Sequence, residues 1–219
     1  MKHHANGQRI DHNPEKDYIS TVTSDMVIGE NSGRIYENRG LIHDNAGSLV
    51  DNFGTVNINH RIINGNYAKV IVNQENAEIF HSCGIVEQNF GRVENNFGIV
   101  AQNYGTVEMM SDPGYRVGFV IDNLEGTVNG GCGEIENSFG GSVSPGVMVH
   151  RQFYKVSVKV DEHLKEPIFD AGFDKKSGIT GKNEMWLYSK AEGQITIQAE
   201  DGYVIDRADG ADEIENRRR

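Results

Sequence analysis

The aliphatic side chains of this sequence recur every seven residues over much of its length. The first series comprises Ile35, Ile42, Leu49, Val56, Ile63 and Val70, and a second comprises Val86, Val93, Val100 and Val107. Asparagine stands four residues before each member of the first series, and glycine stands two residues before several of them. The repeating unit is therefore Asn-aromatic-Gly-x-Val-x-x, and it extends from about residue 31 to residue 143.

The repeat is interrupted in two places. Its phase shifts by two residues between Asn73 and Ser82, and the pattern is weak from Met109 to Leu124. Three glycines then return in phase with Gly105, namely Gly126, Gly133 and Gly140. Because the count is kept, we expect no long insertion between residues 109 and 124.

A seven-residue period also occurs in coiled coils, which need two apolar positions per heptad and strong helix formers. This unit has a single aliphatic position, and each glycine would cost a helix about 1 kcal/mol. Strand alternation instead places Asn, Gly and Val on one face and the aromatic residue on the other. The pattern predicts an all-β protein, a parallel β-solenoid in which stacked asparagines form amide ladders. We favour two units per coil, which gives about eight coils, over a triangular coil of three units.

The aromatic position of the unit is expected to face outward. It is occupied by Phe53, Tyr67, Phe90, Phe97, Tyr104 and Phe139. These rings either pack on one another and on neighbouring loops, or form a surface that binds a partner, because large exposed apolar patches usually have a use. They are our candidate binding residues, and the same rows would permit self-association into a homo-oligomer.

The ends of the chain differ from the repeat. Residues 1–30 include a β-prone stretch from Asp17 to Ile28, and we expect them to cap the first coil, because an uncovered coil is an exposed sheet edge. Residues 144–206 contain short alternating segments separated by turn-rich sequence, which predicts a small antiparallel β-domain. Residues 207–219 form a polar tail that ends in three arginines.

Two parts of the chain resemble known families. The strand from Tyr154 to Val160 and the segment from Gly193 to Ile205 are similar to bacterial surface repeats of the internalin B type, in which a Tyr-x-Val-x-Val strand precedes a Gly-Tyr turn. The heptads resemble the Asn-Gly-x-Val arrays of bacterial cell-surface and phage proteins. The resemblance implies a bacterial or phage context and an adhesive or interaction-mediating role, and it implies no activity.

Charge narrows the range of partners. The formal net charge is −11, and residues 31–149 carry 6 basic and 13 acidic side chains. Such a chain is repelled by nucleic acid and by anionic membranes. No segment approaches the roughly 20 apolar residues of a membrane helix. We therefore expect neither direct nucleic-acid binding nor membrane insertion. The first residues do not resemble a signal peptide. We therefore expect the protein to be located in the cytoplasm of a bacterial or phage-infected cell, unless the chain is a fragment of a surface protein.

The sequence offers no recognisable catalytic motif. It lacks a phosphate-binding loop, a His-Glu-x-x-His pair and a Gly-x-Ser-x-Gly elbow, and its histidines share no phase in the repeat. Cys83 and Cys132 have no Cys-x-x-Cys partner. We expect that the protein is not an enzyme and that it binds no cofactor or metal. We expect instead an adhesin-like binding or structural module that presents its aromatic surfaces to a protein or glycan. The alternatives are a phage or mobile-element inhibitor that acts by protein binding or nucleic-acid mimicry, and a glycan-active β-helix enzyme.

Overall fold

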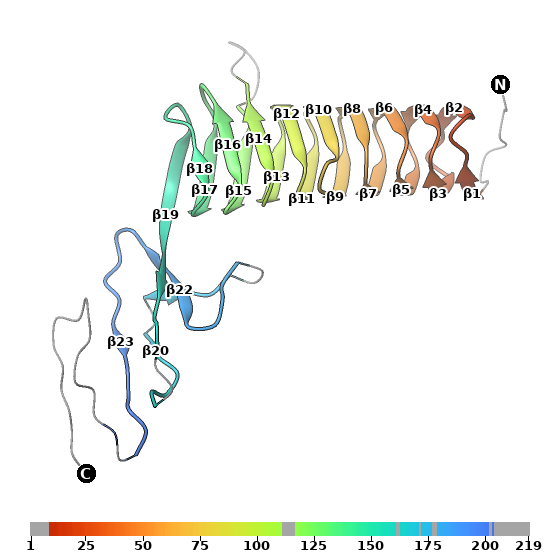
Figure 1. Cartoon of the computed structure of the whole chain (residues 1–219). Coiled ribbons are helices and arrows are strands. Elements are labelled where there is room, and N and C mark those ends of the chain that lie inside the picture. The colour runs from red at the N-terminus through yellow and green to blue at the C-terminus, as the bar shows by residue number, and fades with distance from the viewer. Residues whose placement is uncertain are drawn as a thin grey trace. The chain divides into compact units, whose positions relative to one another are not determined.

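The computed structural model describes residues 9–110, 117–160, 163–170, 172–176, 179–201 and 203 (Figure 1). The chain divides into two compact units, residues 1–152 and residues 153–219. The first unit is a parallel β-solenoid, and the second is a small antiparallel β-structure. The predicted fold class is confirmed for both. The predicted tail, residues 207–219, lies outside the described residues.

The solenoid consists of two facing parallel sheets, and the chain passes from one to the other after every strand. We call them sheet A and sheet B. Sheet A contains β1 (Arg9–Asn13), β3 (Val27–Asn31), β5 (Leu41–Asn45), β7 (Thr55–Asn59), β9 (Lys69–Asn73), β11 (Ile85–Asn89), β13 (Ile99–Asn103), β15 (Phe119–Leu124) and β17 (Glu134–Phe139). Sheet B contains β2 (Tyr18–Val22), β4 (Arg34–Asn38), β6 (Ser48–Asn52), β8 (Ile62–Asn66), β10 (Glu78–Ser82), β12 (Arg92–Asn96), β14 (Thr106–Met109), β16 (Thr127–Gly130) and β18 (Ser142–Val143).

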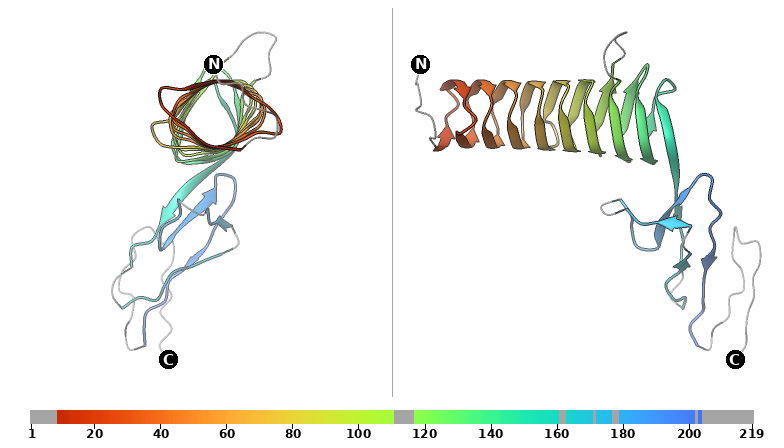
Figure 2. Two further views of the ribbon diagram at one scale, coloured as in Figure 1. Left: turned by 90° about the vertical axis from the view of Figure 1, so that its right-hand side faces the viewer. Right: turned by 180° about the vertical axis from the view of Figure 1, so that it is seen from behind.

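The register of the strands shows that two seven-residue units make one coil. Val56 of β7 lies opposite Ile42 of β5, fourteen residues earlier, and the same spacing joins Leu49 of β6 to Ile35 of β4. Viewed along its axis the solenoid is a closed oval, with a sheet on each side (Figure 2). The two-unit coil is therefore confirmed, and the triangular coil is excluded.

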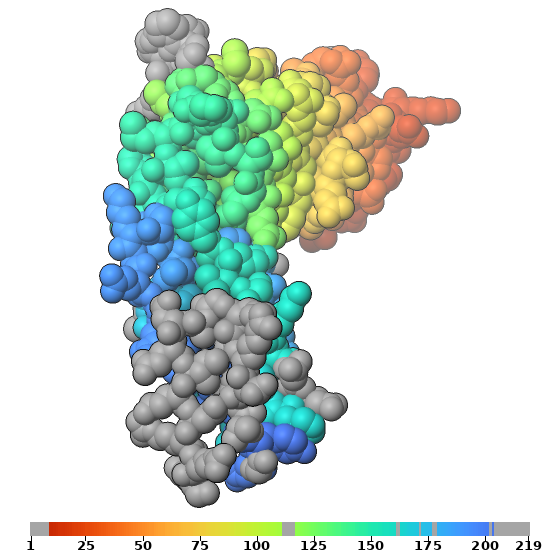
Figure 3. Space-filling view, turned by 60° about the vertical axis from the view of Figure 1, so that its left-hand side comes forward, coloured from red at the N-terminus to blue at the C-terminus, as the bar shows by residue number. Residues whose placement is uncertain are grey.

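The core lies between the two sheets. In the regular five-residue strands the second residue, which is aliphatic, and the fifth, which is usually asparagine, are buried, whereas the first, third and fourth face outward. Val56, Val93 and Val107, for example, have no exposed surface. The predicted inward position of Asn and Val is confirmed. In the space-filling view the coils lie directly against one another in chain order (Figure 3).

The buried asparagines form amide ladders along the axis. In sheet A, each Nδ2 donates to the Oδ1 of the asparagine one coil later, over 2.7–2.9 Å, through Asn13, Asn31, Asn45, Asn59, Asn73, Asn89, Asn103 and Asn123. Sheet B has a shorter ladder, Asn38 to Asn52 to Asn66, which continues to the hydroxyl of Ser82. The ladders satisfy polar groups that burial would otherwise penalise.

The repeat glycines are required because successive coils approach closely. A Cβ placed on Gly47 would lie 2.0 Å from the carbonyl oxygen of Gly33 in the preceding coil, and one on Gly98 would lie equally close to the carbonyl oxygen of Gly84. No L-residue with a Cβ fits there without moving the backbone. Neither Gly47 nor Gly98 has a positive φ, so space rather than backbone conformation selects glycine.

The segment expected to cap the solenoid is itself part of it. β1 pairs with β3 and β2 pairs with β4, both in parallel, so residues 9–30 form coils. Two turns here are longer than the turns of the regular repeat. Each is closed by a backbone hydrogen bond, from Asp17 to Pro14 and from Met26 to Thr23. The same kind of turn, with Ala77 donating to Gln74, produces the phase shift after Asn73. Extra turn residues obscured the seven-residue period in the sequence.

A second expectation, that residues 109–124 hold no long insertion, is wrong. Val120 of β15 lies opposite Val100 of β13, twenty residues earlier, so this coil has six residues more than a regular one. The extra residues fall between β14 and β15. The insertion is nearly as long as one seven-residue unit, so the later glycines stay in phase. Their spacing therefore gave no sign of it.

The second unit contains short antiparallel strands. They are the later part of β19 (Met148–Ser157), β20 (Ile168–Phe169), β21 (Phe173–Asp174), β22 (Glu184–Tyr188) and β23 (Ile195–Thr196). β22 pairs with β19 and with β21, and β20 pairs with β23. Trp186 of β22 is buried, and the ammonium group of Lys155 lies 5.0 Å from its ring centroid.

Candidate interaction surface

The two turns of each coil lie at opposite edges of the sheets and separate the predicted aromatic residues into two groups. We call the turns after sheet B strands the Phe53 edge and those after sheet A strands the Phe90 edge. Phe53, Tyr67 and Phe97 follow β6, β8 and β12, whereas Phe90 and Tyr104 follow β11 and β13. The grouping arises because aromatic residues seven positions apart fall on opposite edges and those fourteen apart fall on the same edge.

Along the Phe53 edge the rings stack on one another. Phe53 and Tyr67 lie face to face, with ring centroids 4.9 Å apart and planes 11° apart, and their exposed fractions are 48% and 47%. The Arg39 guanidinium lies 5.9 Å from the Phe53 centroid, one coil before it. Gly65 makes room for Tyr67, because a Cβ there would lie 2.7 Å from the tyrosine ring. Both faces of Phe53 and one face of Tyr67 are thus covered by neighbouring residues, and exposed ring surface remains.

Further along the same edge lies a shallow apolar hollow, next to the start of β11 and β13. It is lined by Cys83, Ile85, Phe97, Ile99 and Val117, together with two turn glycines. Ile85 and Ile99 are register partners in adjacent strands, and they are 43% and 39% exposed. With Phe97 and Val117 they form one contiguous apolar patch, and such patches often mark a binding site.

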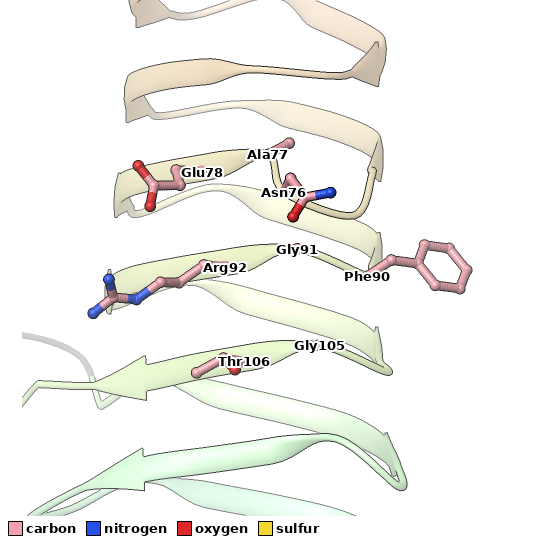
Figure 4. A pocket seen from close by; sticks show the side chains of 8 residues that line it. All are labelled: Asn76, Ala77, Glu78, Phe90, Gly91, Arg92, Gly105 and Thr106. Atoms are coloured by element: carbon pink, nitrogen blue, oxygen red, sulfur yellow. The ribbon is translucent and has the colours of Figure 1, made fainter.

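The Phe90 edge has a second stacked pair. The Phe90 and Tyr104 centroids are 4.7 Å apart, with planes 9° apart. Beside this pair the longer turn at Asn76, whose φ is 64°, leaves another shallow hollow (Figure 4). Figure 4 shows that Phe90 points away from the sheet, while Glu78 and Arg92 lie on the far side of the hollow.

The cation beside this hollow, Arg92, is already paired. Arg92 binds Glu94 at 2.8 Å and Glu108 at 2.6 Å. The hydrogen bond to Glu108 raises the pKa of the Arg92 guanidinium, so the side chain stays a cation. With Glu78, three carboxylates surround this one cation, so the rim is net negative and its only cation is already bound. The Phe90 edge is therefore the weaker of the two candidates.

Phe139, the remaining predicted surface residue, is buried, with an exposed fraction of 1%. The turns after Asn123 and Ser138 each have one extra residue before the next aliphatic position. The residue after the asparagine position therefore extends the strand instead of entering the turn, and Phe139 pairs in register with Leu124, which is buried too. Its assignment to an exposed aromatic row is wrong.

The aliphatic part of the surface, Ile85, Ile99 and Val117, was missed in the sequence. A detectable signal was present: isoleucine occupies the outward position just after glycine in two units fourteen residues apart. Reading the repeat at fourteen instead of seven residues would have placed Ile85 and Ile99 side by side. Val117 lies beyond the regular repeat and carries no such signal.

Within the described residues, no group of three or more His, Cys, Asp or Glu side chains is arranged to hold a metal ion. The same residues include no helix long and apolar enough to span a lipid bilayer. The chain matches no protein-family model, no curated protein and no solved structure.

Proposed function

We propose that this protein is a non-enzymatic binding module, in which the solenoid is a rigid support and its Phe53 edge binds a protein or glycan. The observation that carries the proposal is the row of exposed rings and aliphatic side chains along one edge of a solenoid whose inward aliphatic residues are buried. Solenoids commonly bind partners along such extended surfaces.

The ladders and the close stacking of the coils favour a rigid support. Each internal asparagine of the sheet A ladder is bonded to the coils on both sides, and each regular coil is held to the next by strand pairing. A surface that is already ordered loses little conformational entropy on binding. An adhesin-like role suits this design, because an adhesin displays a fixed surface to its partner.

Two measurements on the full chain test the proposal. Protein and glycan arrays are probed with the wild type and with the double variant Phe53→Ser, Tyr67→Ser, and we expect a ligand that binds the first and not the second. Hydrolysis of soluble glycans by the wild type, abolished by Glu94→Gln or Glu108→Gln, would instead identify an enzyme and refute the proposal.

A further inference from the structure

The apolar hollow on the Phe53 edge has no side chain able to bind a polar ligand. None of the lining side chains carries a charge, an amide or a hydroxyl group, and most of the exposed lining is apolar. A sugar placed there would find no side-chain partner for its hydroxyl groups, and leaving them unpaired costs free energy when they are removed from water. A phosphate or another ionic ligand would find no counter-charge. The chemistry of the walls therefore selects an apolar ligand group.

The neighbouring rings are also poorly placed for glycans. Sugars stack on the open faces of aromatic rings, but Phe53 has Tyr67 on one face and the Arg39 guanidinium on the other. The edges of such stacked rings suit apolar protein side chains, which need contact area and no hydrogen-bonding partners. Together, the hollow and the rings favour a protein over a glycan.

The acidic character of the whole repeat indicates the composition of that protein. Lys69, the register partner of Ile85, is bound to Glu87 at 2.6 Å and is thereby neutralised. The repeat as a whole has 13 acidic and 6 basic side chains between residues 31 and 149. A partner with basic residues beside its apolar group would be attracted to this surface, whereas an acidic one would be repelled.

We infer that the hollow formed by Cys83, Ile85, Phe97, Ile99 and Val117 binds an aromatic or branched aliphatic side chain of a protein partner, and that basic residues flank this side chain. The inference rests on the proposed function and specifies it, since it assigns the partner to proteins and the contact to one place on the edge.

The experiment selects a phage-displayed library of random peptides on the immobilised full chain. Selected peptides should share an aromatic or branched aliphatic residue next to Lys or Arg. Their Kd should rise at least tenfold, roughly 1.4 kcal/mol, for Ile99→Asp, which places a charge in the hollow. It should be unchanged for Ile62→Asp, the matched control at the same outward position of β8 in sheet B. Should Ile99→Asp melt far below the wild type, Ile99→Ser and Ile85→Ser replace it.

The alternative results separate this inference from the proposed function. In one such result, peptides lose affinity for the double variant Phe53→Ser, Tyr67→Ser and still bind Ile99→Asp normally. That result would refute the hollow as the binding site and would leave the proposed binding module intact. A glycan whose binding is lost in Ile99→Asp would overturn the choice of a protein partner. A dimer in light scattering that Ile99→Asp dissociates would show that a second copy fills the hollow instead. If neither peptides nor glycans bind the wild type, both the inference and the proposed function fail.

Discussion

Each internal asparagine of the sheet A ladder both donates to and accepts from its neighbours. All the amides point the same way along the axis, so every Nδ2 meets an Oδ1 and no two acceptors face each other. Aligned hydrogen bonds in a low-dielectric interior strengthen one another. The same arrangement makes each member sensitive, because removing one side chain leaves unsatisfied groups in both adjacent coils.

We predict that Asn59→Ala lowers the free energy of unfolding by about 2 to 6 kcal/mol, since two buried polar groups each lose a hydrogen bond at about 1–3 kcal/mol. These groups are Asn45 Nδ2, which keeps its bond to the Ile62 carbonyl oxygen, and Asn73 Oδ1; both lie 2.8 Å from the Asn59 amide. Urea unfolding followed by circular dichroism measures the effect. The control Asn57→Ala, an outward residue of the same strand, should cost under about 1 kcal/mol. Equal losses would show that the ladder adds nothing specific.

A second prediction concerns glycine. Gly47→Ala should destabilise the protein by about 3 kcal/mol or more, because its Cβ would lie 2.0 Å from the Gly33 carbonyl oxygen and would push two coils apart. Gly131→Ala is the control, since a Cβ there meets no atom within 4 Å. Thermal melting of the two variants checks the difference. A Gly47→Ala protein as stable as the wild type would show that the coils can separate at little cost.

At the scale of the strand, the inward and outward positions have different energetic roles. Val93, the second residue of β12, is completely buried between the sheets, whereas Phe97 lies in the turn that follows and is only half-buried. An inward position tolerates no charge, because a carboxylate there is removed from water without a partner. An outward position mainly contributes contact area on one side.

We therefore expect Val93→Asp to lower the free energy of unfolding by about 4 kcal/mol or more, and Phe97→Ser to lower it by about 1 kcal/mol. Chemical denaturation of both variants under the same conditions makes the comparison. A greater loss for Phe97→Ser would mean that the aromatic position, and not the aliphatic one, carries the core.

The regular strands were predictable from the sequence, because glycine, asparagine and an aliphatic residue each have a separate physical reason to recur. The aliphatic residue fills the core, the amide bonds the next coil and the glycine permits close approach. Turn length has no such signature. The longer turns before Asp17 and Met26 hid the first coils, and the single extra residue after Ser138 turned Phe139 inward. The hollow was hidden for a related reason, since it depends on residues that adjoin only across coils.

At the scale of the whole solenoid, each coil contacts chiefly the coil before it and the coil after it. The strand order within each sheet follows the chain, β3 to β5 to β7 in sheet A and β4 to β6 to β8 in sheet B. The stability of such a molecule is approximately a sum over coils and the interfaces between them. Removing one regular coil should then remove one coil and one interface, and the remaining coils can rejoin.

Deleting residues 46–59 tests this directly, because these fourteen residues make one coil. After the deletion Asn45 takes the position of Asn59, so its Nδ2 can donate to Asn73 Oδ1 and the aliphatic positions stay in register. We expect a folded β-protein by circular dichroism with a modestly lower melting temperature. Deleting the sixteen residues 46–61 removes little more chain but joins Asn45 of β5 directly to Ile62 of β8, so no turn residues remain to cross from sheet A to sheet B. That variant should fail to fold cooperatively. If both deletions behave alike, the fourteen-residue register is not what holds the coils together, and the nearest-neighbour description of this solenoid is wrong.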